Sequence, residues 1–524
     1  MELASFFGKN PKDIQKVILS DADITIEEYI AIARYHAQIE FSQVFIKRVK
    51  DSRAIIEGFL SENRLIYGVT TGFGENVRYV IPPDEAAELQ HNIVRSHAAS
   101  VGEPLCEELV RAIQLQMILN TGKGNSGISF PLINLIRELL NNKITPYAPG
   151  EGSVGYLGVE GHMTLVLMGE GQAYYQGKLM DSKEALSAAG LKPLTLGCKE
   201  GLSLLNGSTS VTGIAVMALY DAIVAAKTID IAGCMTFEAL KATILGCDER
   251  LHSLKRHSEQ QSTAGIFRHL LKDSGIMQQY KHARVQDPYA LRCTPHLHGA
   301  GKRLIKQAHE NIWEEVLSVS DNPVVHPGKN GEEDTALMGG NFDGSYVGSA
   351  ADMLCVAAGI LGKTSERRSD RMVNRFFSNL PAFLVKNPGL NNGFMIPQYT
   401  AAGLLNEIRM LSYPSSVDSV PTCANQEDPV SMAYTASKKA YSVAKKLQYI
   451  VAIELMIALQ AVDLSEDGFA LSSVMQKLHD NLRKDVPTVD EDRYFGPDME
   501  LLFQKVRHCH IINIVEEQAG KLPF

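Results

Sequence analysis

The spacing of apolar residues along this 524-residue chain predicts a mainly α-helical fold. Apolar side chains recur every three or four positions over long stretches, which is the spacing that gives a helix one buried face. The alternation of apolar and polar residues that marks a half-buried strand is limited to short runs, such as residues 178–180. Glycine and proline are most frequent over residues 68–207, where we expect turns and loops.

Six stretches have helical periodicity, and in chain order they are 109–119, 132–140, 211–226, 350–361, 433–463 and 471–482. From about residue 211 the helical pattern continues to the C-terminus, which predicts one bundle of long helices. No run near residue 200 has the composition of a flexible linker. We therefore predict a smaller, Gly-rich N-terminal domain, residues 1–200, packed against a central and C-terminal helical bundle, residues 201–524.

Composition excludes several classes of protein. Hydrophobic residues make up 45% of the chain and charged residues 21%, which excludes a disordered chain. The 51 basic and 60 acidic residues give a net charge of −9, so we expect no nucleic-acid partner. The eight cysteines form no C-x-x-C pair, which excludes a zinc ribbon or a thioredoxin-like motif.

The sequence also predicts a cytoplasmic protein without a membrane partner. The N-terminal residues lack the basic stretch and apolar segment of a signal peptide. The apolar stretch 447–464 contains Glu454, Gln460 and Asp463, which favours a buried helix of a large bundle over a membrane span.

Glycines cluster in three segments, residues 67–74, 150–162 and 339–344, and the second matches a dinucleotide-binding pattern. Gly150, Gly152 and Gly155 have the spacing G-x-G-x-x-G, but the preceding residues KITPYAPG are not a buried strand. A nucleotide-binding βαβ unit is therefore not expected. Taken alone, the three clusters would indicate only turns between helices.

A set of nine segments, however, resembles the histidine and aromatic amino-acid ammonia-lyases over nearly the whole chain. In order, they are 67–74 (YGVTTGFG), 96–99 (SHAA), 205–207 (LNG), 286–293 (QDPYALRC), 320–323 (SDNP), 339–342 (GGNF), 365–368 (SERR), 389–394 (GLNNGF) and 424–428 (ANQED). The resemblance implies the long helical bundle of the fumarase/aspartase/histidase-like superfamily. It also implies a homotetramer whose active sites are shared between subunits.

The family's cofactor is a methylidene-imidazolone (MIO) made from an internal Ala-Ser-Gly, and this chain departs from that pattern. The flanking segments 152–155 (GSVG) and 162–163 (HM) are kept, but the segment between them is three residues shorter than in the family. Leu157 occupies the position of the reactive serine, and leucine has no hydroxyl to eliminate. Ser153 would need the branched Val154 as the attacking residue. We therefore predict that MIO does not form and that no other cofactor replaces it. The altered loop comprises Gly155, Tyr156, Leu157, Gly158 and Glu160.

The resemblance also implies roles for residues outside this loop. Tyr67 matches the family's catalytic base and lies in a Gly-rich segment expected to act as a lid. Tyr289 matches a second catalytic residue, and Arg292 matches the clamp that binds the substrate carboxylate through its planar guanidinium. The remaining substrate-binding residues that the resemblance implies are His97, Asn206, Gln286, Phe342 and Glu427.

His97 and Glu427 favour an imidazole-bearing substrate, because a carboxylate accepts a hydrogen bond that a phenyl ring does not offer. Asp343 and Pro429, however, replace histidines common in the histidine-specific branch. His97, His296, His298 and Glu160 have residue types that bind zinc or iron, but their spacing does not require a site, and we predict no metal.

These observations leave three functions open. The favoured one is an MIO-independent enzyme that binds an amino acid or a related carboxylate and uses Tyr67 as base. General base catalysis supplies only about 10²- to 10⁴-fold of an enhancement that is typically about 10⁶-fold or more, so ordinary histidine deamination is expected to be lost. The alternatives are a non-catalytic amino-acid-binding or regulatory protein and a conventional lyase that converts histidine to urocanate.

Overall fold

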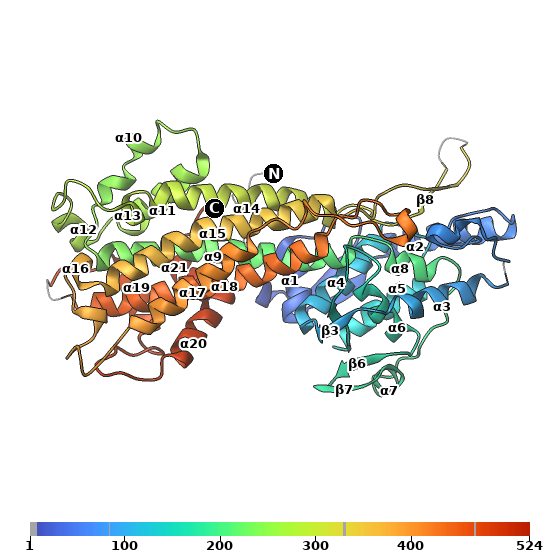
Figure 1. Cartoon of the computed structure of the whole chain (residues 1–524), viewed down its shortest axis with the longest axis horizontal. Helices are drawn as coiled ribbons and strands as arrows, with labels where there is room; N and C mark the ends of the chain where they lie inside the picture. Colours follow the sequence, from blue (N-terminus) through green and yellow to red (C-terminus); the bar gives the residue numbers. More distant parts are fainter. Residues whose placement is uncertain (1–7, 83, 329–331, 466–467) are drawn as a thin grey trace.

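The computed structural model describes residues 8–82, 84–328, 332–465 and 468–524, and it confirms the mainly helical fold. Long helices run side by side along the longest axis of the molecule, and the N-terminal elements gather at one end of this bundle (Figure 1). Its four main helices are α9 (Thr209–Ala239), α14 (Thr294–Val316), α15 (Ser345–Val373) and α18 (Ala433–Asp463).

The N-terminal part combines helices with short strands. Its helices are α1 (Ile26–Tyr35), α2 (Gln43–Ser61), α3 (Ala86–His97), α4 (Glu107–Thr121), α5 (Phe130–Asn141), α6 (Val159–Leu167), α7 (Ser182–Ala188) and α8 (Glu200–Leu205). Its strands are β1 (Lys16–Leu19), β2 (Gln38–Phe41), β3 (Val101–Pro104), β4 (Thr145–Pro146), β5 (Pro149–Glu151), β6 (Gln172–Tyr175) and β7 (Lys178–Asp181). β1 pairs with β2 in parallel, whereas β3 with β5 and the sheet β4-β6-β7 are antiparallel.

The far end of the bundle carries short helices and the C-terminal helices. The first group is α10 (Glu249–His252), α11 (Ser258–Leu270), α12 (Gly275–Gln279), α13 (Tyr289–Arg292) and α16 (Arg375–Ser378). The second is α17 (Met395–Leu411), α19 (Ser473–Leu482), α20 (Gly496–Arg507) and α21 (His510–Ala519). A hairpin of β8 (Val324–His326) and β9 (Thr335–Leu337) returns to the N-terminal end.

Helix α9 extends 13 residues beyond the predicted 211–226 because its charged residues have buried partners. Every residue of α9 is buried. Lys227 donates to Glu516 at 2.7 Å, and Asp230 accepts from His298 at 2.7 Å. These charges interrupt the apolar pattern of the sequence, but pairing lets them remain inside the bundle.

Two stretches of the described chain are long and apolar enough to cross a membrane by length and composition alone. They are Glu200–Ala239, whose apolar window is 100% buried, and Ser345–Val373, whose window is 61% buried. Core helices of large proteins pass the same test.

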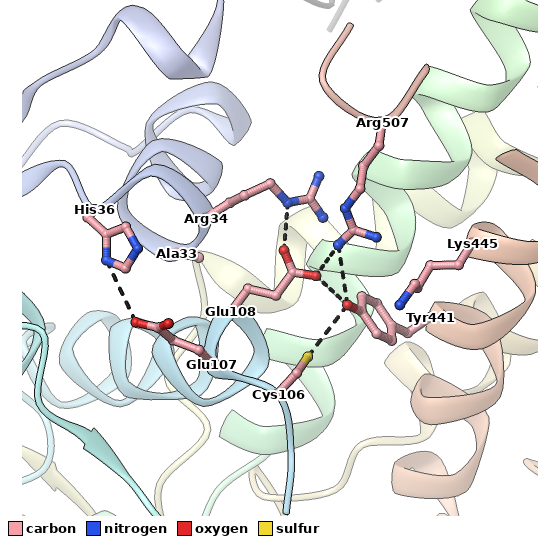
Figure 2. Close-up of a pocket in the computed structure, with 9 residues that line it drawn as sticks. All are labelled: Ala33, Arg34, His36, Cys106, Glu107, Glu108, Tyr441, Lys445 and Arg507. Atoms are coloured by element: carbon pink, nitrogen blue, oxygen red, sulfur yellow. Dashed lines mark hydrogen bonds and ion pairs between the residues drawn. The ribbon is translucent and has the colours of Figure 1, made fainter. Parts of the chain in front are cut away.

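Glu108 joins the N-terminal part to the bundle at a pocket between α1, α4, α18 and α20 (Figure 2). Its carboxylate accepts from Nε of Arg34 at 2.7 Å and also contacts Arg507 and the Tyr441 hydroxyl. Arg34 donates its two terminal nitrogens to Asp221 of α9 at 2.8 and 3.0 Å. The network therefore ties four helices together through one carboxylate.

We expect Glu108→Gln to destabilise the protein by about 3 kcal/mol at pH 7. Burial opposes the charged form, but Arg34, Arg507 and the hydrogen bonds from Arg34 and Tyr441 lower the pKa of Glu108 to about 2. A lowered pKa stabilises the fold above the ordinary value of 4.5, and this stabilisation is lost as pH falls from there to about 2. Urea unfolding at pH 7, 4 and 3 measures the effect. Glu107→Gln is the control, because that neighbouring side chain is 52% exposed; equal losses in the two variants would contradict the expectation.

Candidate active site

The altered loop connects β5 to α6 and is held in one conformation by its backbone. Gly155 has φ +143°, and a Cβ there would lie 2.6 Å from Oγ of Ser431. The amide of Leu157, itself at φ +58°, donates to the carbonyl of Leu205 at 3.2 Å. The loop is thereby placed against the end of α8.

Glu160 fixes the loop to the first turn of α9. Its side chain is fully buried, and its Oε1 accepts from the amide of Ser210 at 3.0 Å and from the hydroxyl of Thr209 at 3.2 Å. Oε2 accepts from the amide of Gly158 at 3.2 Å. Burial raises the pKa of Glu160, and these hydrogen bonds oppose the increase. The new carboxylate therefore serves the loop and a helix N-terminus, where a carboxylate is favoured.

The residues of this loop do not fit the family's MIO group. Leu157 offers no hydroxyl, and the loop's serine is engaged elsewhere. The hydroxyl of Ser153 accepts from the amide of Gly155 at 3.2 Å and donates to the carbonyl of Tyr156 at 3.4 Å. The residue that would have to attack after Ser153 is the branched Val154.

Tyr67 lies in the Gly-rich segment expected to form a lid. Its hydroxyl accepts from the amide of Gly74 at 2.8 Å, and its ring meets Phe73 edge-on at 6.3 Å. Burial raises the pKa of Tyr67, the hydrogen bond from Gly74 lowers it, and nearby Cys423 and Glu427 raise it further. The phenol is therefore protonated at neutral pH in the single protomer, and a cation bound beside it would favour the phenolate.

His97 ends α3 near the same carboxylate. Burial lowers the pKa of His97, whereas its hydrogen bond to the backbone of Ile93 and the charge of Glu427 raise it. Glu427 accepts from the hydroxyl of Thr422 at 2.7 Å. Two residues implied by the family, Tyr67 and His97, thus both lie within electrostatic reach of a third, Glu427.

Tyr156 of the altered loop meets Phe342 in the same neighbourhood. The two rings pack edge to face, with centroids 5.1 Å apart and an angle of 75°. Burial raises the pKa of Tyr156, and the carboxylates of Glu427 and Asp343 raise it further. The rings of Tyr156 and Phe342 and the carboxylates of Asp343 and Glu427 therefore lie close together. Two of these four residues, Tyr156 and Asp343, depart from the family pattern.

Asn206 closes this group at the end of α8. It is buried, and its Nδ2 donates to the carbonyl of Asn322 at 3.0 Å. Oδ1 of Asn322 accepts in turn from the amide of Gly339 at 2.9 Å. This connection places the segment 339–342 beside the site.

Gln286, Tyr289 and Arg292 lie at the opposite end of α9. The segment is held there because Asp287 accepts from the amide of Thr243 at 2.6 Å and Arg284 donates to the carbonyl of Leu240 at 3.2 Å. The 31 residues of α9, Thr209–Ala239, span about 45 Å. One protomer therefore brings together Tyr67, His97, Asn206, Phe342 and Glu427 but does not bring Arg292 to them.

At this end of α9, Tyr289 is exposed and Arg292 is partly buried beside it. Tyr289 is 69% exposed, and the Arg292 guanidinium lies over its ring at 4.6 Å. Nε of Arg292 is buried without a hydrogen-bond partner among the described residues. An unused guanidinium donor is what a carboxylate ligand requires.

The histidines considered for a metal site are separated. His298 is fully buried, where Nδ1 contacts Asp230 at 2.7 Å and Nε2 contacts Arg368 at 2.9 Å. The ring of His296 lies 5.3 Å from that of His252. Across the described ranges, no group of three or more His, Cys, Asp or Glu residues is arranged to hold a metal ion.

Sequence reasoning missed Cys423 as a neighbour of the lid. A Cβ on Gly74 would lie 2.5 Å from Sγ of Cys423, so the thiol contacts the residue that donates to Tyr67. Cys423 directly precedes the segment 424–428, and this position was the signal available in the sequence.

Comparisons with known proteins match nearly the whole chain. The family description "Aromatic amino acid lyase" fits residues 24–484. A histidine ammonia-lyase of Streptococcus sanguinis is 42% identical over 478 residues, covering 91% of this chain and 92% of that protein. The crystal structure of histidine ammonia-lyase from Trypanosoma cruzi has a TM-score of 0.89 and 34% identity, covering 97% of this chain and 99% of that one. The ergothioneine-degrading ergothionase from Treponema denticola has a TM-score of 0.86 and 26% identity, covering 95% and 100%.

Proposed function

Because this chain belongs to the aromatic amino acid lyase family, we propose that it is an enzyme of the histidine ammonia-lyase type that acts without MIO. Its ligand is an amino acid or a related carboxylate, and Tyr67 is the base. The observation that carries this proposal is Leu157 at the position of the reactive serine, in a chain that keeps Tyr67, Asn206 and Arg292. A protein without catalysis has no physical need for the tyrosine of the lid.

The arrangement assigns separate tasks to the two ends of the bundle. His97 and Glu427 suit an imidazole-like ring, and Tyr67 takes a proton from the carbon beside the one that bears the amine. Arg292, with Tyr289 and Gln286, binds the carboxylate from a second subunit, since the Tyr67 of its own subunit lies at the other end of α9, a helix about 45 Å long. We therefore propose a homotetramer with shared sites, in the cytoplasm and without nucleic-acid or membrane partners.

A second candidate function is the elimination of a tertiary amine from a substrate that carries a quaternary ammonium group. Tyr156, Phe342, Asp343 and Glu427 together favour a quaternary ammonium, which is attracted to ring faces and carboxylates. Ergothioneine, which the structurally similar ergothionase degrades, is a histidine-derived betaine with three methyl groups on its nitrogen.

Such a substrate does not require an attached electrophile. Tyr67 takes the β-proton, the electrons of the C–H bond form the carbon–carbon double bond, and the C–N bond breaks. Its electron pair goes to a nitrogen that already carries a positive charge, so a neutral tertiary amine leaves. The bound cation also lowers the pKa of Tyr67 and favours its phenolate form.

Intact mass and a ligand panel test the proposal together. We expect the full sequence mass, thermal stabilisation by imidazole-bearing α-carboxylates, and release of trimethylamine from histidine betaine or ergothioneine. Loss of two waters from the mass, with urocanate formed from histidine, would establish the conventional lyase instead. Stabilisation by ligands without proton exchange or amine release from any of them would establish the non-catalytic binder.

A further inference from the structure

A second cavity lies behind the segment that carries Arg292. It has a volume of about 540 Å³ and is formed by the 3-10 helix η4 (Ile244–Cys247), helices α10, α11 and α12 and the chain after them. These elements lie at the end of the bundle remote from the N-terminal part (Figure 1). The cavity therefore lies outside the group around Tyr67.

The walls of this cavity differ in character. Leu271 and Met277 are each 3% exposed and, together with Leu245, form an apolar surface. Polar side chains line the remainder, and they are the cations Arg250, Arg268, Lys272 and Lys281, the carboxylates Asp248 and Glu249, and Gln278. The cavity has the size of a small-molecule site and offers both an apolar contact and positive charge.

The four cations differ in whether they form ion pairs. Arg250 pairs with Asp248 at 2.7 Å, and Arg268 approaches Glu249 at 3.8 Å. Lys272 and Lys281 form no ion pair with any residue that the structure describes. Residues 248–284 contain seven Lys and Arg against four Asp and Glu, in a chain whose net charge is −9. This segment therefore carries a net positive charge within an acidic chain, which favours an anionic ligand in the cavity it lines.

The cavity and Arg292 share a wall. Ile244 and Leu245 of η4 line the cavity, and a Cβ on the next residue, Gly246, would lie 3.3 Å from Cα of Arg292. Thr243, just before η4, donates its hydroxyl to the carbonyl of Lys281 at 2.7 Å and its amide to Asp287 at 2.6 Å. The segment from Lys281 to Arg292 is therefore attached to η4 near both of its ends. A ligand that draws Lys281 toward η4 would act on both attachments.

We propose that this cavity binds a phosphorylated small molecule with a flat apolar body, of the class of nucleoside phosphates, and that its binding shifts the position of Arg292. Lysine ammonium groups suit phosphate as point charges, and the apolar wall receives the base. The binding site stands on the cavity alone. Only the consequence for Arg292 rests on its proposed role as carboxylate clamp.

Calorimetric titration of the full-length protein with ADP and with inorganic pyrophosphate tests the site. We expect ADP to bind more tightly than pyrophosphate, and Lys272→Ala/Lys281→Ala to weaken both by roughly 10-fold or more. The control is Lys183→Ala/Lys192→Ala, which removes two exposed lysines at the other end of the molecule and should leave binding unchanged. Leu245 is 37% exposed at the rim of the cavity, and Leu245→Glu should weaken the binding of ADP until its affinity no longer exceeds that of pyrophosphate.

Failure of both probes to bind below millimolar concentration, or binding that the double lysine variant does not weaken, would overturn the site. Equal affinity for ADP and pyrophosphate would overturn the apolar contact. Hydrogen exchange over residues 284–292 tests the coupling, which requires slower exchange in the ADP complex. Unchanged exchange would overturn the coupling but not the site, and neither result depends on whether the enzyme reaction occurs.

Discussion

Tyr67→Phe is expected to slow proton removal from the bound ligand by about 10²- to 10⁴-fold, which is the contribution of a positioned general base. Phenylalanine keeps the ring against Phe73 but removes the hydroxyl that is proposed to take the proton. Because burial raises the pKa of Tyr67, the wild-type rate should increase with pH up to that pKa, and the rate of the variant should not. Solvent deuterium incorporation into the ligand, or amine release, measures the rate of each protein and its dependence on pH.

Tyr79→Phe is the matched control, since this tyrosine follows the same 3-10 turn, η3 (Gly74–Arg78), and is 58% exposed. Ligand affinity should remain the same in all three proteins. Mixing Tyr67→Phe subunits with Arg292→Ala subunits should restore part of the activity, because a shared site can then combine an intact residue from each. Equal rates for Tyr67→Phe and wild type would remove Tyr67 from the mechanism, and failure to restore activity would contradict shared sites.

Glu454→Ala is expected to destabilise the protein by about 3–5 kcal/mol, because it leaves a buried guanidinium without its counter-charge. Glu454 and Arg368 are both fully buried, and Nε and Nη2 of Arg368 reach the carboxylate at 2.5 and 2.8 Å. The hydroxyls of Thr236 and Ser365 donate to the same carboxylate at 2.8 and 2.6 Å. One side chain thus joins α9, α15 and α18. Chemical denaturation at fixed protein concentration measures the loss.

The double variant Glu454→Leu/Arg368→Met separates the cause. Removing both charges leaves neither of them unpaired, so it should cost less than Glu454→Ala alone. Glu407→Ala is the surface control, because that carboxylate is 55% exposed and should change stability by about 0.5 kcal/mol or less. A double variant less stable than Glu454→Ala would show that the pair itself, and not an unpaired charge, stabilises the bundle.

Periodicity alone located the bundle where the apolar pattern is unbroken. Residues 433–463 were predicted as a helix and coincide with α18, and the short strand at 178–180 lies within β7. The pattern failed at the C-terminal half of α9, where Lys227 and Asp230 are buried with partners more than 60 residues away in sequence. Local spacing carries no information about such partners.

The nine ordered segments indicated the family from the sequence, and the family comparison confirms it. That MIO does not form, because Leu157 has no hydroxyl to eliminate, stays a prediction, and it too comes from the sequence, since covalent chemistry depends on which atoms are present. The tertiary structure decided the rest. It showed Glu160 as the anchor of the altered loop and His298 as part of a core ion network with Asp230 and Arg368. It also placed Tyr156 and Asp343 beside Glu427 and placed Arg292 at the far end of α9. Those outcomes depend on distances between residues remote in sequence, which only the packing of the helices sets.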